Sequence, residues 1–392
     1  MNQSLFILGR QPAIGLAELE SLYGASALRP LNGAAIVDID PQHVDFNRLG
    51  GAMKLTQVLH ELDTTDWFKI EKYLLKMVPE HLQYVPEGKL TLGLSVYGLS
   101  ATINMLTKTG LTLKKVIKNT GRPVRLVPNK TPALGSAQVL HNDLMGDRGW
   151  ELVFVRNGEK TIVCLTIAEQ DIEAYGARDQ ARPKRDARVG MLPPKLAQNI
   201  INLAAGTTPV TGQTVLDPFC GTGVVLQEAL LMGYNVVGTD LEPRMIDYST
   251  ANITWLQHNW QAAQGNVNIE VGDAQKHQWK QPINLVAAET YLGEPISQMP
   301  DPAKLARLVD GTDSLHYKML ANLHKQLPRG TRLCLAVPAW RTKKGFKHLP
   351  TLDQLGKLGY TRMVFEHAKN DDLIYAREDQ MVARELVVLV TK

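Results

Sequence analysis

The stretch Val215-Leu-Asp-Pro-Phe-Cys-Gly-Thr-Gly223 decides how the second half of this 392-residue chain folds. A short apolar strand runs directly into a glycine turn, and a helical pattern follows over residues 224–232. Glycine has no Cβ, so a ligand can approach the backbone N–H groups of a turn that opens a helix. The motif therefore predicts a site for a nucleotide-like ligand at the end of this strand.

Outward from this turn, the sequence alternates regularly between apolar runs and helical segments. Seven segments are expected to be strands: 214–217, 235–239, 267–271, 283–288, 331–337, 363–367 and 385–391. Most are nearly continuous apolar runs, which is typical of strands covered on both faces. Helices are expected between the first five. This pattern predicts an α/β, doubly wound, Rossmann-like sheet that binds ligands at the carboxyl ends of its strands.

Acidic residues follow three successive strands of the predicted sheet. Asp217 can accept hydrogen bonds from an ammonium group, such as that of a methionine moiety. Asp240 stands about twenty residues beyond the loop, where a carboxylate can bind both ribose hydroxyls. Asp273 would lie near an adenine amine, although a Gly-Asp turn alone also explains it. The third glycine of a dinucleotide fingerprint is missing, so the pattern favours S-adenosylmethionine over a nicotinamide cofactor.

Composition and charge limit the remaining possibilities. The chain is 44% hydrophobic and 21% charged with a net charge of +4, as expected of a protein with two or three domains. It shows no secretory leader and no run of eighteen apolar residues, so we expect a cytoplasmic protein that does not span a membrane. Its three cysteines lie far apart and predict neither a zinc site nor a disulfide framework, and no metal is expected.

The N-terminal half mixes strands and helices in α+β fashion. Strands are expected at 5–8, 37–39 and 89–96, and helices at 14–23 and 67–78. Between Glu87 and Asp143 there is no acidic residue, while eight lysines and arginines fall in that interval. Such a stretch predicts a folded basic surface, which suits a nucleic acid but is also compatible with a solvated face that has no ligand.

The glycine stretch resembles the cofactor loop of methyltransferases that modify exocyclic amines of nucleic acids, in particular the archaeal and eukaryotic tRNA guanosine N2-methyltransferases. Leu8-Gly-Arg-Gln-Pro12, Gly135-Ser-Ala-Gln-Val-Leu-His-Asn142 and Gly190-Met-Leu-Pro-Pro-Lys-Leu-Ala197 are similar to that family's ferredoxin-like module, THUMP domain and connector. The resemblance implies a ferredoxin-like module at 1–65, a THUMP RNA-binding domain at 66–172, a basic linker at 173–195 and a methyltransferase domain at 196–392. It implies that the protein binds tRNA and methylates a guanosine at position ten.

The resemblance also assigns site residues. The cofactor-binding residues it implies are Asp217, Pro218, Phe219, Cys220, Gly221, Gly223, Asp240, Leu241, Asp273 and Ala274. Basic residues that would then contact tRNA are Lys114, Lys115, Lys118, Arg122, Arg125, Lys130, Arg182, Lys184, Arg185, Lys343 and Lys344. For the linker and for the run that holds Lys343 and Lys344, a solvated segment without a ligand is an equal alternative.

The fourth strand departs from the family pattern. The family ends this strand with Asp-Pro-Pro-Tyr-Gly, whereas this chain has Glu289-Thr-Tyr-Leu-Gly293. Glu289 replaces the aspartate that holds the target amine, and Tyr291 or Leu292 would pack on the base. The change leaves open a divergent enzyme, an enzyme for another amine, a binding protein without catalysis, or a surface carboxylate.

Overall fold

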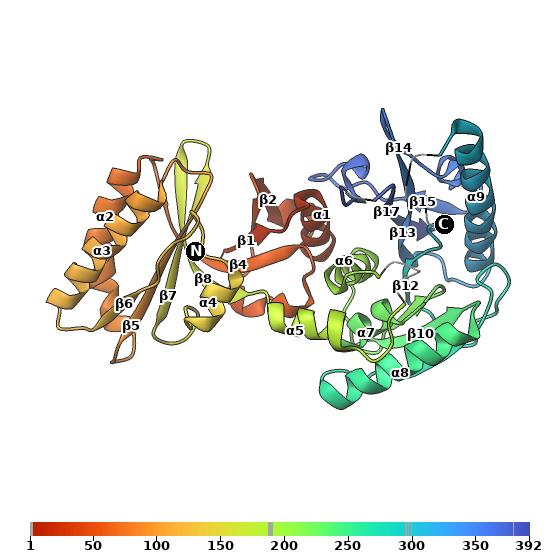
Figure 1. Cartoon of the computed structure of the whole chain (residues 1–392), viewed down its shortest axis with the longest axis horizontal. Helices are drawn as coiled ribbons and strands as arrows, with labels where there is room; N and C mark the ends of the chain where they lie inside the picture. The colour runs from red at the N-terminus through yellow and green to blue at the C-terminus, as the bar shows by residue number, and fades with distance from the viewer. Residues whose placement is uncertain (1–2, 187–190, 295, 297, 299, 379) are drawn as a thin grey trace. The chain divides into compact units, whose positions relative to one another are not determined.

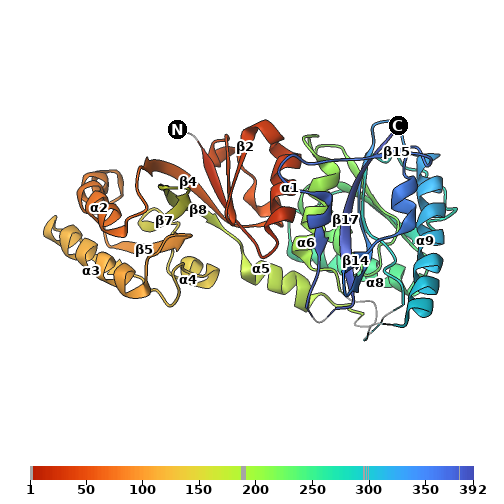
Figure 2. The same ribbon diagram turned by 90° about the horizontal axis from the view of Figure 1, so that it is seen from above.

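The computed structural model describes residues 3–186, 191–294, 296, 298, 300–378 and 380–392. The chain divides into two compact units (Figures 1 and 2). The N-terminal unit comprises Met1–Pro12, Ser26–Asn47 and Ala52–Glu173. The C-terminal unit comprises Ala13–Ala25, Arg48–Gly51 and Ala174–Lys392.

The N-terminal unit is built on one mixed sheet. Over the described residues this sheet has eight strands in the order β2-β3-β1-β4-β8-β7-β5-β6. The strands are β1 (Ser4–Leu8), β2 (Leu28–Leu31), β3 (Ala34–Val37), β4 (Ala52–Leu62), β5 (Leu90–Tyr97), β6 (Val124–Leu126), β7 (Gly149–Asn157) and β8 (Lys160–Glu169). The helices are α2 (Trp67–His81), α3 (Ile103–Asn119) and the short α4 (Ser136–His141). Helices α2 and α3 lie side by side and pack their apolar faces on the sheet (Figure 1).

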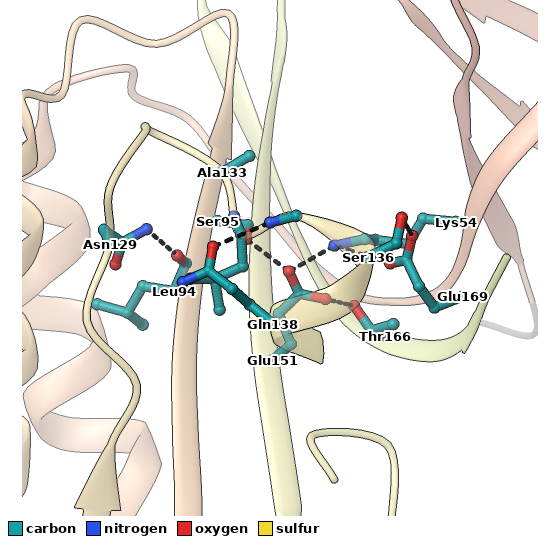
Figure 3. Close-up of polar contacts among 12 residues, drawn as sticks. Lys54, Leu94, Ser95, Asn129, Ala133, Ser136, Gln138, Glu151, Thr166 and Glu169 are labelled. Atoms are coloured by element: carbon teal, nitrogen blue, oxygen red, sulfur yellow. Dashed lines mark hydrogen bonds and ion pairs between the residues drawn. The ribbon is translucent and has the colours of Figure 1, made fainter. Parts of the chain in front are cut away.

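A polar cluster is buried in the middle of this sheet (Figure 3). The ammonium of Lys54 on β4 lies 2.5 Å from the carboxylate of Glu151 on β7, and the hydroxyl of Ser95 on β5 donates to the same carboxylate at 2.5 Å. Ser136, at the start of α4, donates to Glu169 on β8 at 2.6 Å. Because buried charges are stable only when paired, the cluster explains how a strand with an internal lysine forms here.

The structure corrects several N-terminal predictions. The strand expected at 37–39 is β3, which ends at Val37, and β2 and β4 were not predicted. The expected boundary near residue 65 separates strands that pair in one sheet, since β4 pairs with β8. Residues Ala13–Ala25, which include most of α1 (Pro12–Tyr23), belong to the C-terminal unit instead of a module at 1–65.

The C-terminal unit contains the doubly wound sheet that the sequence predicts. Its described strands run in the order β11-β10-β9-β12-β13-β17-β15, with β14 beside β13 and β16 beside β17. The strands are β9 (Thr214–Asp217), β10 (Asn235–Asp240), β11 (Val267–Val271), β12 (Leu285–Glu289), β13 (Arg332–Thr342), β14 (Gly345–Lys347), β15 (Tyr360–Arg362), β16 (Ile374–Tyr375) and β17 (Val382–Thr391). Strands β9 to β13 are parallel to their neighbours, and β17 is antiparallel to β13.

Helices cover both faces of this sheet. Further elements of the unit are α5 (Ile172–Gly176), the π-helical turn η5 (Ala177–Ala181), α6 (Pro194–Ala205), α7 (Val224–Leu231), α8 (Pro243–Asn259) and α9 (Pro302–His324). Residues of α1, α6, α7 and α8 form one apolar core on one face. Residues of α9 form a second core on the other face. The predicted α/β architecture of this half is therefore confirmed.

Three predictions for the C-terminal half are wrong. Residues 272–284 form turns instead of a helix, because Asp273 caps a turn and Pro282 lies within this short polar segment. Residues 363–367 do not form the expected strand, because the strand of this region, β15, spans Tyr360–Arg362. After β15, the backbone N–H groups of Glu366 and His367 donate to the carboxylate of Glu20 on α1. The linker expected at 173–195 is helical over α5 and η5, while 187–190 lie outside the described residues.

Candidate functional site

Three carboxylates meet at the carboxyl edge of the C-terminal sheet. Asp217 ends β9, Asp240 ends β10 and Glu289 ends β12, and β9 pairs with both of the other strands. Burial raises the pKa of Asp217 well above its ordinary value, and the nearby negative charges of Asp240 and Glu289 raise this pKa further. The edge therefore concentrates negative charge, which suits a cationic ligand.

The glycine loop lies beside these acids. Gly221 and Gly223 have φ angles of +50° and +82°, and Gly223 is the residue before α7. A Cβ at Gly221 would meet only one atom within 4 Å, the Phe219 carbonyl at 3.9 Å, so the backbone here is open to a ligand. The thiol of Cys220 is buried in the core, so Cys220 can offer a ligand its backbone only.

The second acid is tied to this loop. Each oxygen of Asp240 accepts one backbone N–H, from Gly221 at 2.9 Å and from Glu242 at 3.0 Å. The backbone N–H of Leu241 also bonds to this carboxylate. Since a carboxylate has about four acceptor positions, one can remain for a donor such as a ribose hydroxyl. The neighbouring Leu241 is 65% exposed and offers an apolar surface next to the carboxylate.

The third predicted cofactor acid has a structural partner of its own. One oxygen of Asp273 accepts the N–H of Gln275 at 3.0 Å, which closes a turn after β11. The N–H of Gly272 donates to the Asp240 carbonyl at 2.9 Å, so this turn starts beside the end of β10. Ala274 is buried beneath the turn. This turn supports the simpler explanation of Asp273. The second oxygen of Asp273 lies 3.8 Å from the exposed ammonium of Lys276 and can also accept a hydrogen bond from a ligand.

Glu289 does not stand alone at the end of β12. The Nε of Arg384 on β17 donates to one of its oxygens, and both side chains are mostly buried. Burial raises the pKa of Glu289, and the guanidinium of Arg384 opposes this rise. Sequence reasoning missed Arg384, although an arginine at the start of the apolar run of β17 was a signal that it has a buried partner.

Thr290, the residue after Glu289, is hydrogen-bonded to a histidine of α9. The Thr290 hydroxyl lies 2.7 Å from Nε2 of His316 on α9, and Nδ1 of His316 lies 2.8 Å from the Thr312 carbonyl. Since a carbonyl only accepts, Nδ1 carries the proton and Nε2 accepts from Thr290. Tyr291 is 44% exposed and available to pack on a base, whereas Leu292 is half-buried.

The expected RNA-contacting residues fall into different environments. Nine of them are at least partly exposed and form no ion pair with another described residue: Lys114, Lys115 and Lys118 on α3, and Arg125, Lys130, Lys184, Arg185, Lys343 and Lys344 elsewhere. Arg122 instead donates to the carbonyls of Leu82, Val85 and Pro86. Arg182 is buried, so it offers no exposed guanidinium to a phosphate.

Among the described residues, no group of three or more His, Cys, Asp or Glu side chains is placed to hold a metal ion. Over the same part of the chain, no helix is both long and apolar enough to cross a bilayer.

Comparisons with known proteins give the site a context. Residues 177–251 match a family described as DNA methylase. The tRNA (guanine(10)-N2)-dimethyltransferase of Methanothermobacter thermautotrophicus is 31% identical over 164 residues, which cover 41% of this chain and 43% of that protein. The enzyme of the same name from Pyrococcus abyssi is 30% identical over 188 residues, covering 48% of this chain and 51% of that protein. These matches thus span about half the length of the relatives.

The fold is shared more widely. The crystal structure of TrmN from Thermus thermophilus superposes with a TM-score of 0.51 and 18% identity, covering 100% of both chains. At this identity the likeness concerns the fold alone.

Proposed function

We propose that this protein transfers a methyl group from S-adenosylmethionine to the exocyclic N2 amine of a guanosine in tRNA. The observation that carries the proposal is the sheet edge where Asp217, Asp240 and Glu289 lie beside an open glycine loop. The names of the curated relatives support both the reaction and the tRNA substrate. The match to DNA methylases over the glycine loop supports the same class of chemistry on a base.

The residues of this edge fit S-adenosylmethionine. Asp217 is buried with one oxygen bonded to the Phe219 N–H, and no cation pairs with it among the described residues, so an ammonium group would supply the missing partner. Asp240 retains an acceptor position for a ribose hydroxyl, and Leu241 and Asp273 suit the adenine ring. Pro218, Phe219, Cys220, Gly221, Gly223 and Ala274 would shape the pocket chiefly through their backbone.

Glu289 is the group we assign to the target amine. When bound, S-adenosylmethionine supplies a methyl group activated by its sulfonium sulfur. Glu289 would accept a hydrogen bond from the amine and aim the nitrogen lone pair at that methyl, and Tyr291 would pack on the base. The ion pair with Arg384 favours the ionised carboxylate against the effect of burial and fixes its position, which compensates in part for the missing prolines of the family's loop.

The N-terminal unit supplies a surface for RNA. One exposed face of α3 carries a shallow hollow lined by Asn104, Thr107, Lys108, Leu111, Thr112 and Lys115. Ammonium groups can neutralise phosphates there, while Leu111 offers an apolar contact. We assign tRNA binding to this face, and we propose that the N-terminal unit contains the THUMP domain that the resemblance implies.

The decisive experiment uses unmodified tRNA transcript, S-adenosylmethionine with a labelled methyl group, and nucleoside analysis by mass spectrometry. We expect label in N2-methylguanosine and none in a transcript whose target guanosine is replaced by adenosine. Absence of label in any RNA at micromolar enzyme would refute methyl transfer to RNA.

The Glu289–Arg384 ion pair also favours a second candidate, an RNA-binding protein that retains the methyltransferase fold without turnover. This candidate predicts RNA affinity that falls steeply with salt and is unchanged by Glu289→Gln. Turnover that Glu289→Gln abolishes would eliminate it.

A further inference from the structure

Helix α8 holds the glycine loop by two of its carbonyl groups. The hydroxyl of Ser249 donates to the Gly221 carbonyl at 2.6 Å, and Nδ2 of Asn252 donates to the Thr222 carbonyl at 2.8 Å. Because the C=O and N–H of a trans peptide point in opposite directions, both bonds turn the next N–H groups away from α8. The helix therefore sets the orientation of the peptide planes that a ligand meets.

Asn252 also holds a second segment, the stretch 184–186, in which Lys184 and Arg185 are exposed and Asp186 is buried. Its Oδ1 accepts the N–H of Lys184 at 2.9 Å, and its Nδ2 donates to the Lys184 carbonyl at 2.9 Å. The side chain is fully buried and uses both of its N–H groups in these contacts. One amide group is thus shared between the glycine loop and stretch 184–186.

A second contact anchors the same stretch to α8. The guanidinium of Arg244 lies 2.9 Å from the Asp186 carboxylate, which is mostly buried. Arg244 and the Lys184 ammonium each lie 5.6 Å from the ring centre of Tyr248. Within the described part of the chain, the side chain of Arg244 pairs with Asp186 and lies over Tyr248, so it can be changed without removing a hydrogen bond to the glycine loop.

We propose that Asn252 is a positioning residue that couples stretch 184–186 to the glycine loop, so that the anchoring of this stretch sets cofactor affinity. The proposal rests on the proposed cofactor site. Its physical basis is that the two segments share one rigid amide: displacing Lys184 shifts the Asn252 side chain and loosens the Thr222 carbonyl. Energetic coupling of this kind appears as non-additive effects of two substitutions.

The test is a double-mutant cycle measured by calorimetric titration with S-adenosylhomocysteine. Asn252→Asp keeps the acceptor for Lys184 and loses both donors, and we expect about tenfold weaker binding. Arg244→Gln should weaken binding about threefold in the wild-type background and have no effect in the Asn252→Asp background. Lys318→Gln, which removes an exposed charge on α9, is the matched control and should leave affinity unchanged.

Amide hydrogen exchange tests the coupling even if the Asn252→Asp variant folds poorly, because it needs only the Arg244→Gln variant. In Arg244→Gln we expect faster exchange over 220–224 as well as over 183–186. If Arg244→Gln changes neither the affinity nor the exchange of the loop, or if the two substitutions are additive, the coupling does not exist. A wild-type protein that gives no heat with S-adenosylhomocysteine would instead refute the proposed cofactor site.

Discussion

Asp217 shows how burial prepares a residue for a charged ligand. Its carboxyl group is only 2% exposed and has Asp240 and Glu289 as negative neighbours, which together raise its pKa. A carboxylate in this position is costly without a cation. An ammonium group that pairs with Asp217 would remove that cost, so the free protein and the ligand complex should differ in protonation.

We therefore predict that cofactor affinity rises with pH. A bound ammonium group lowers the raised pKa of Asp217, so binding releases a proton and tightens as pH increases through the pKa of the free protein. Calorimetry with S-adenosylhomocysteine in two buffers of different ionisation enthalpy measures the proton release and the affinity. The titrations are made below about pH 7, where the α-amino group of the ligand stays protonated. Asp217→Asn should abolish the dependence. Identical heats in both buffers, with a pH-independent affinity, would contradict the assignment.

Arg384 gives a second prediction at a single residue. It lowers the pKa of Glu289 against the effect of burial, so Arg384→Gln should raise that pKa and shift the acidic limb of the kcat profile to higher pH. The profile is measured at saturating cofactor. Arg362→Gln is the matched control, because Arg362 pairs with a different buried glutamate, Glu385, in the same sheet. A limb that stays in place in Arg384→Gln would show that Glu289 is not the titrating group.

At the scale of elements, the sequence predicts those strands, turns and helices that are determined by residues close together in the chain. The turn after β9 combines a strand, two glycines and a helix within twenty residues, and both its position and Asp240 follow from spacing alone. Strand β4 was not predicted, because Lys54 interrupts its apolar pattern. The partner of Lys54, Glu151, is nearly a hundred residues away in the sequence. Arg384 is equally remote from Glu289 in sequence.

Helix residues that support the site were missed for another reason. Asn252 and His316 are polar residues on amphipathic helices, where a pattern predicts an exposed face. Only the structure shows that both side chains are buried and bonded to loops of the sheet edge. Such residues carry no signal in a single sequence, because their partners belong to other elements.

His316 predicts how stability responds to acid. Burial lowers the pKa of His316 to about 4, whereas in the unfolded chain it should be near its ordinary 6.5. The unfolded state therefore binds the proton first, and stability is lost as pH falls from 6.5 towards 4. Urea unfolding at pH 7 and pH 5 should show a loss of about 2 kcal/mol that His316→Gln lacks. Equal pH dependence in both proteins would contradict a buried neutral histidine.

At the scale of the whole molecule, each unit has a local surface of one charge sign. The C-terminal unit gathers carboxylates at its sheet edge, whereas the N-terminal unit presents Lys108, Lys115 and Lys118 on the exposed face of α3. The sequence predicted this basic surface from the absence of acids between Glu87 and Asp143. It could not predict that Arg122 donates to backbone carbonyls or that Arg182 is buried, since both depend on tertiary contacts.

The basic face of α3 predicts a specific salt dependence. Replacing Lys108, Lys115 and Lys118 together by glutamine should weaken tRNA binding and lower the slope of log K against log salt by about two to three. The matched control replaces Lys69, Lys72 and Lys76, three exposed lysines on α2, and should change the slope less. Fluorescence anisotropy over a range of salt concentrations gives both slopes. Equal effects of the two triple variants would mean that α3 is not the RNA-binding face.

A crystal structure of the protein with S-adenosylhomocysteine tests the central claim most directly. The account predicts density in which the ammonium group contacts Asp217, a ribose hydroxyl contacts Asp240 and the sulfur faces Glu289. Density for the ligand at any other place, or a fully occupied ligand whose sulfur lies far from Glu289, would contradict the proposed site and its role in methyl transfer.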